Sequence, residues 1–197
     1  MSPPSGPAPS EPPTLFARFQ GRRPDAGAPR GRPGPWVILA AWGPCGFAPI
    51  APGTFGTLGA IPLFWALSFT TWPVYVGVTL ALLAVGVYAA RRAGGHWGVV
   101  DASPIVIDEV VGYLVTMAFV PFSWPAALAG FLLFRLFDVL KPWPASAFDR
   151  VKSGFGVMMD DVAAGVFAWG ALQLLEVVLR MGFGCSGGRF WCAELGA

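Results

Sequence analysis

The run that decides the fold reads WPVYVGVTLALLAVGVYAA from Trp72 to Ala90. It closes an uncharged stretch of 55 residues that begins at Trp36. A helix that crosses a lipid bilayer needs roughly 20 apolar residues. Because the backbone must satisfy its own hydrogen bonds in lipid, long apolar runs without alternation predict helices. The stretch therefore predicts two membrane-embedded helices, or one helix and a re-entrant segment over residues 36–50.

The composition of the whole chain agrees with a protein solvated by lipid. Of its 197 residues, 55% are hydrophobic and only 12% are charged, and the mean hydropathy is +0.60. Soluble domains carry about 25% charged residues. The net charge of +2, without a block of basic residues, argues against nucleic acid as a partner.

The apolar segments predict an all-α, polytopic helix bundle with four to five membrane-embedded helices. The expected segments are 57–69, 72–90, 105–120, 125–140 and 157–179. Basic residues concentrate in cytoplasmic loops of membrane proteins. This rule places the N-terminus, Arg91-Arg92 and the segment after residue 140 in the cytoplasm.

Three regions follow from the same pattern. Residues 1–35 hold 10 of the 20 prolines and predict a disordered cytoplasmic tail. Residues 36–180 form the expected membrane-embedded catalytic domain, and residues 181–197 form a short C-terminal tail.

Five acidic residues fall where three of these helices meet one membrane face. Asp108 and Glu109 begin the third segment, Asp138 ends the fourth, and Asp160 and Asp161 begin the fifth. Ionised groups at membrane depth are costly and are usually functional. Five converging carboxylates predict a hard divalent cation with oxygen ligands, and Mg²⁺ suits a site that also takes phosphate. The alternative is a set of interfacial caps in contact with water.

Polar groups suited to phosphate accompany the acids. Arg135, Asp138 and Lys141 share one helical face if the helix continues to Lys141. Arg135 is a candidate phosphate ligand, a structural partner of Asp138, or both. Thr54 and Thr57 lie in a Gly- and Thr-rich loop that is either a phosphate cradle or a flexible turn.

Five ordered motifs resemble the phosphatidylglycerophosphatase A family. They are Pro49-Ile-Ala-Pro-Gly-Thr-Phe-Gly-Thr-Leu58, Ile105-Val-Ile-Asp-Glu-Val-Val-Gly112, Phe134-Arg-Leu-Phe-Asp-Val-Leu-Lys-Pro-Trp-Pro144, Asp149-Arg150 and Gly154-Phe-Gly-Val-Met-Met-Asp-Asp-Val-Ala-Ala-Gly165. The resemblance spans residues 36 to about 175 and leaves out both tails.

The resemblance implies a Mg²⁺-dependent enzyme of the bacterial cytoplasmic (inner) membrane with its site facing the cytoplasm. Such an enzyme converts phosphatidylglycerophosphate to phosphatidylglycerol and phosphate. The polar positions carried over are Asp108, Glu109, Arg135, Asp138, Lys141, Asp149, Arg150, Asp160 and Asp161. We expect the five helix-end acids to supply catalysis and metal ligands, and Thr54, Thr57, Arg135, Lys141, Asp149 and Arg150 to bind substrate. The favoured mechanism is attack by metal-activated water rather than through an aspartyl phosphate.

A divalent-cation or proton-coupled transporter is the alternative from another class, since intramembrane acids suit it as well. Transporters place their sites near the bilayer midplane. These acids gather instead at one face, which favours the phosphatase.

Overall fold

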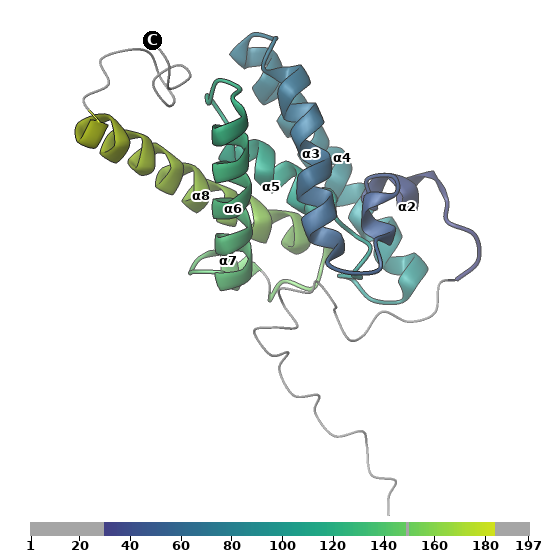
Figure 1. The fold of residues 1–197 in the computed structure, drawn as a ribbon. Helices are drawn as coiled ribbons and strands as arrows, with labels where there is room; N and C mark the ends of the chain where they lie inside the picture. Colours follow the sequence, from purple (N-terminus) through teal and green to yellow (C-terminus); the bar gives the residue numbers. More distant parts are fainter. Residues whose placement is uncertain (1–29, 149, 184–197) are drawn as a thin grey trace, which may run out of the picture.

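The computed structural model describes residues 30–148 and 150–183, and over these residues every regular element is a helix, as expected. It forms α2 (Pro35–Ala40), η1 (Cys45–Phe47), α3 (Pro52–Leu67), α4 (Trp72–Trp97), α5 (Ile107–Thr116), α6 (Trp124–Leu140), α7 (Ala145–Phe148) and α8 (Gly154–Phe183). Figure 1 shows α5 at the centre, with α3, α4, α6 and α8 around it. The predicted tails fall almost wholly outside the described residues.

Two of the described helices are long and apolar enough to cross a membrane. They are Trp72–Trp97, which is α4, and Gly154–Leu179 within α8. They correspond to the second and fifth expected segments. Length and composition therefore support two crossings directly, fewer than the four or five expected from the sequence.

The central helix α5 differs most from its predicted segment. It has ten residues, nine of them buried, and at 1.5 Å per residue it rises only about 15 Å. The bilayer core is about 30 Å thick. The segment 105–120 is therefore a short helix enclosed by its neighbours rather than a full-length span. A bend over residues 99–101 and a turn at residues 103–104 precede it, and an irregular loop follows it.

The crossing of α5 and α8 sets the position of the acidic residues. A Cβ atom on Gly165 would clash with the carbonyl oxygen of Gly112, and one on Gly112 would lie 2.8 Å from the carbonyl oxygen of Asp161. The hydroxyl of Thr116 lies 3.0 Å from the Gly112 carbonyl oxygen and 3.3 Å from that of Gly165. The two helices therefore meet backbone to backbone.

Large apolar side chains cover the outside of the bundle. Leu132 and Leu174 are each 64% exposed, and Val166 and Val178 are more than half exposed. Water-solvated proteins rarely expose contiguous apolar surface on this scale. The outer surface is therefore suited to contact with lipid.

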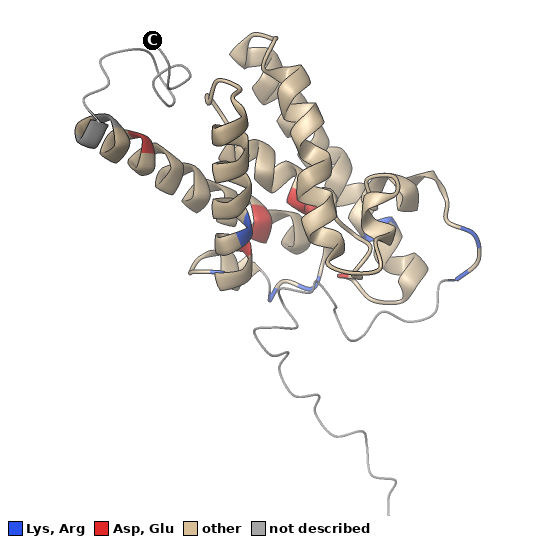
Figure 2. Cartoon of the chain, in the orientation of Figure 1, with Lys and Arg blue, Asp and Glu red and all other residues tan. Residues whose placement is uncertain are grey.

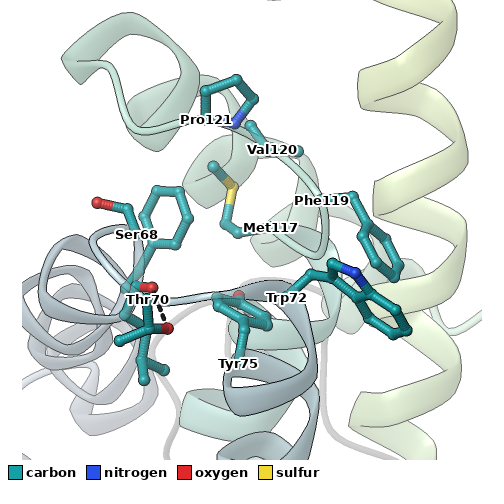
Figure 3. Close-up of a pocket in the computed structure, with 10 residues that line it drawn as sticks. Ser68, Thr70, Trp72, Tyr75, Met117, Phe119, Val120 and Pro121 are labelled. Atoms are coloured by element: carbon teal, nitrogen blue, oxygen red, sulfur yellow. Dashed lines mark hydrogen bonds between the residues drawn. The ribbon is translucent and has the colours of Figure 1, made fainter.

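A small apolar cavity lies at the end of the bundle away from the acidic residues. It has a volume of about 230 Å³ and is lined by the end of α3, the start of α4, the turn between them and the α5–α6 loop. Figure 3 shows the rings of Trp72, Tyr75 and Phe119 around Met117. Its lining includes no acidic or basic residue among those described, so it lacks the groups that bind phosphate.

Candidate functional site

Three acidic side chains meet inside the bundle. Asp108 and Glu109 of α5 and Asp161 of α8 each offer a carboxylate oxygen, and these oxygens all lie within 4.8 Å of one another. All three residues are buried, with exposures of 1%, 7% and 2%. We call these three residues the carboxylate cluster.

The helix crossing explains why the cluster forms. Asp108 lies four residues before Gly112, and Asp161 lies four residues before Gly165. Residues four apart lie one above the other on a helix. Each acid is therefore one turn away from the point where the two backbones touch, and the two carboxylates converge. The first turn of α5 also holds Asp108 and Glu109, where the helix dipole favours negative charge.

Two further acids lie beside the cluster, each against a cation. Arg135 Nη1 is 2.6 Å from Asp138 Oδ2 and 3.9 Å from Glu109 Oε1. Lys141 Nζ is 2.5 Å from Asp160 Oδ2. We call Arg135–Asp138 and Lys141–Asp160 the flanking ion pairs. The structure thus brings all five predicted helix-end acids to one region, visible in Figure 2 where α5, α6 and α8 meet.

The helix does not continue to Lys141, so the condition for a face shared by Arg135, Asp138 and Lys141 is not met. Helix α6 ends at Leu140, and Lys141 adopts a left-handed conformation with φ of 44°. Such a conformation is uncommon for a residue with a side chain. It ends the helix, and Lys141 contacts Asp160 on α8 instead.

The N-terminus of α3 touches the rim of the cluster. Its N-cap Ala51 is left-handed with φ of 49°, and Pro52 begins the helix. A Cβ atom on Gly53 would clash with Glu109 Oε1 and would lie 3.1 Å from Arg135 Nη1. The first turn of α3 therefore lies against a buried acid and a partly buried cation. Pro52 has no N–H and the Thr54 N–H donates to the Ala51 carbonyl oxygen at 2.9 Å, so the Gly53 N–H is the donor of this turn that the helix leaves without an acceptor.

The other predicted phosphate ligands have different surroundings. Thr54 is partly exposed in that first turn. Thr57 is fully buried, and its hydroxyl donates a 2.9 Å hydrogen bond to the Gly53 carbonyl oxygen. Arg150 is exposed in the segment between α7 and α8. Asp149 lies outside the described residues.

Three glycines matter to this site, although sequence reasoning gave them no role. Gly112 and Gly165 allow the α5–α8 contact, and Gly53 admits Glu109. Each lies inside a motif quoted for the family resemblance. The available signal was the spacing of four residues from an acid to a glycine in two separate segments.

The carboxylate cluster offers a donor set suited to a hard cation. Within the described part of the chain, Glu109 Oε2 and Asp161 Oδ2 are buried and have no hydrogen-bond partner. Hydrogen-bond acceptors in this state carry a desolvation cost that a bound cation would offset. Three carboxylate oxygens match the preference of Mg²⁺ for oxygen ligands.

Comparisons with known proteins place this site within a matched segment. A family model described as phosphatidylglycerophosphatase A matches residues 38–176, which contain the carboxylate cluster and both flanking ion pairs. The phosphatidylglycerophosphatase A of Escherichia coli is 40% identical over 143 residues, covering 72% of this chain and 83% of that protein. The Haemophilus influenzae phosphatidylglycerophosphatase A is 39% identical over 137 residues, covering 68% and 84%.

Another relative carries a different functional name. A Bacteroides thetaiotaomicron protein with a provisional name of phosphatidylinositol-3-phosphatase is 41% identical over 143 residues, covering 68% of this chain and 88% of that protein. No solved structure matches the chain. The matched length and the identity show that this chain belongs to the phosphatidylglycerophosphatase A family.

Proposed function

We propose that this protein hydrolyses phosphatidylglycerophosphate to phosphatidylglycerol and inorganic phosphate, with Mg²⁺, at the cytoplasmic face of a bacterial membrane. The observation that carries the proposal is the buried carboxylate cluster inside the family-matched segment. The names of two relatives supply the substrate. Those names give no support to the transporter alternative.

Asp108, Glu109 and Asp161 are the residues that would hold Mg²⁺. Their oxygens lie close together, and the buried atoms of Glu109 and Asp161 described above fit this role. When bound, Mg²⁺ would offset negative charge on the phosphate that is transferred. Without a cation, three buried carboxylates would disfavour an anionic substrate.

Arg135 is the best-placed protein group for binding the substrate phosphate. Its guanidinium carries five N–H donors in a planar fork, of which only a part is used by Asp138. It lies beside the first turn of α3, where the Gly53 N–H and the Thr54 hydroxyl add donors. A phosphate bound at the rim where Arg135 meets α3 would lie next to Glu109.

The flanking acids take a positioning role in this proposal. Asp138 orients Arg135, and Asp160 holds Lys141 against α8. The ammonium group of Lys141 carries three donors, one of which Asp160 accepts. Asp138 and Asp160 therefore set the positions of two cations at the rim of the cluster, rather than supplying metal ligands.

The membrane placement belongs to the same proposal. Beyond α4 and α8, helices α3 and α6 have 16 and 17 residues, which corresponds to lengths of about 24–26 Å. The apolar outer surface supports embedding all four with α5 enclosed among them. Figure 2 shows Lys and Arg along the lower half of the bundle. The α3–α4 and α5–α6 connections at its top carry none. This asymmetry supports a site that faces the cytoplasm.

The decisive experiment measures phosphate release from phosphatidylglycerophosphate in detergent micelles, with Mg²⁺ or with EDTA. We expect Mg²⁺-dependent release that falls about 10²- to 10³-fold in Asp161→Asn, the loss typical for removing one electrostatic contact to a transition state. The matched control is Glu176→Gln, a buried acid 15 residues farther along α8, and it should retain release. Release that persists in EDTA would exclude the metal site.

A second arm of the phosphate-release experiment tests substrate specificity. The provisional name of the Bacteroides relative indicates a phosphoinositide headgroup for that protein. The same assay with phosphatidylinositol 3-phosphate should give slower release than with phosphatidylglycerophosphate. Faster release from phosphatidylinositol 3-phosphate would support hydrolysis at this site but would identify a phosphoinositide as the substrate.

A further inference from the structure

A second cavity lies apart from the carboxylate cluster and is lined by cations. It has a volume of about 670 Å³ and lies between the C-terminal part of α4 and the start of α8. Arg30, Arg91 and Lys152 line it from three separate segments. Its described lining includes no acidic residue. We call it the cationic pocket.

Backbone contacts fix the walls of this pocket. The Arg30 N–H donates a 2.9 Å hydrogen bond to the His96 carbonyl oxygen, which ties the entering chain to the end of α4. Gly98 has a left-handed φ of 73°, and a Cβ atom there would lie 3.6 Å from Arg30 Nη2. A Cβ atom on Gly154 would lie 2.9 Å from the backbone nitrogen of Arg91, so α8 begins directly against α4.

The start of α8 adds backbone donors to these cations. Ser153 caps the helix: its hydroxyl oxygen accepts from Gly156 N–H at 3.1 Å, and its carbonyl oxygen accepts from Val157 N–H at 3.1 Å. The N–H groups of Gly154 and Phe155 precede the helical ladder, so the helix itself gives them no acceptor. Both residues line the pocket. The positive end of the helix dipole therefore points toward the three cations.

Three exposed cations around one cavity give it a positive potential that favours an anion. Within the described part of the chain, none of the three forms an ion pair with an acidic side chain. Arginine forks, a lysine and helix N-terminal N–H groups together are the donors that bind phosphate groups. The cavity is also larger than a single phosphate requires, since a water molecule occupies about 30 Å³.

We propose that the cationic pocket binds the phosphate group of an anionic ligand, at a site separate from the carboxylate cluster. The ligand is either an anionic phospholipid headgroup or free inorganic phosphate. Gly154 and Asp160 are six residues apart on α8, so the pocket begins about 9 Å along the helix axis from the acids. Because the pocket has no part in the proposed hydrolysis, its test does not depend on that activity.

The test uses the full chain in EDTA, so that no metal recruits phosphate to the carboxylate cluster. One arm titrates inorganic phosphate into protein in uncharged detergent and follows thermal stability. The other arm reconstitutes the protein in phosphatidylcholine nanodiscs with phosphatidylserine, and mass spectrometry then counts the phosphatidylserine retained after extraction. Binding in the first arm identifies free phosphate, and binding in the second arm alone identifies a lipid headgroup.

The variant Arg91→Gln with Lys152→Gln should weaken whichever binding is observed by about tenfold or more, because it removes two charge-assisted contacts. Arg92→Gln is the matched control. Arg92 lies next to Arg91, and its Nη2 donates to the Tyr88 hydroxyl at 2.6 Å rather than lining the pocket. If the double variant does not fold, Lys152→Gln alone serves, since Lys152 is exposed. Absence of binding in both arms, or equal weakening by Arg92→Gln, would overturn the proposal.

Discussion

The carboxylate cluster and the flanking ion pairs lie side by side but differ in what surrounds their acidic groups. In the ion pairs each acid contacts a cation, whereas in the cluster the acids face one another. Asp160 and Asp161 are consecutive on α8, yet Asp160 contacts Lys141 while Asp161 faces Asp108 and Glu109. Successive residues of a helix point about 100° apart, so one faces the end of α6 and the other faces α5. Adjacent acids in a sequence can therefore have separate roles, one joining two helices and the other presenting a ligand.

The carboxylate cluster and the flanking ion pairs also differ in their expected contribution to the stability of the fold. A buried ion pair offsets much of the desolvation cost of each charge, and removing one partner is expensive. Buried like charges add repulsion to desolvation and are retained when they serve a site. The flanking pairs should therefore stabilise the fold, whereas the cluster should weaken it until a cation binds.

Breaking a flanking pair should give the largest effect on stability. Lys141→Met removes the ammonium group that contacts Asp160, which is only 3% exposed, and should lower the free energy of unfolding by about 3 kcal/mol. Chemical denaturation in micelles measures the change. Lys152→Met removes an exposed lysine and should change stability by less than about 0.5 kcal/mol. Equal losses of stability in the two variants would show that the Lys141–Asp160 pair does not stabilise the fold.

The close approach of α3 to the cluster gives the next largest effect. Gly53→Ala forces the added methyl group against Glu109 Oε1, and the resulting shift should lower the hydrolysis rate about 10²-fold. The control is Gly77→Ala on α4, where a Cβ atom meets nothing within 4 Å. Full activity in Gly53→Ala would show that the position of Glu109 is not critical.

Neutralising one acid of the cluster should stabilise the metal-free protein. Asp161→Asn removes repulsion from its acidic neighbours, so unfolding in EDTA should need about 1–3 kcal/mol more free energy. Mg²⁺ at 100 times its Kd should offset most or all of this difference, since it stabilises the wild type by about 2.7 kcal/mol. Thermal unfolding with and without Mg²⁺ measures both. A variant less stable than wild type in EDTA would show that Asp161 forms a stabilising pair instead.

The helix crossing beneath the cluster gives the smallest effect. Thr116→Val keeps the shape of the side chain but removes its hydrogen bonding to the Gly112 and Gly165 carbonyl oxygens, which should cost about 1 kcal/mol. Thr79→Val is the control, because that hydroxyl bonds only the Tyr75 carbonyl oxygen of its own helix. A larger loss at Thr79 than at Thr116 would argue against the crossing as a source of stability.

Much of the candidate site could be predicted because charge is so rare in this chain. Acids that interrupt apolar segments stand out, and the orientation deduced from basic residues alone placed Asp108, Asp138 and Asp160 at one face. The left-handed turn at Lys141 could not be predicted, because it breaks the helical spacing on which the expectation rested. The shortness of α5 was also hidden, since an apolar residue enclosed by protein and one facing lipid look alike in a sequence.

The sequence by itself determined the helical class, the family and the polar residues that gather between the helices, because long apolar runs and rare charges are local properties of the chain. Only the tertiary structure decided which acids face a cation and which face one another. That division depends on where α5, α6 and α8 cross, and the crossing depends on glycines whose missing side chains matter only when a second helix is present. The cationic pocket likewise exists only because α8 begins against α4.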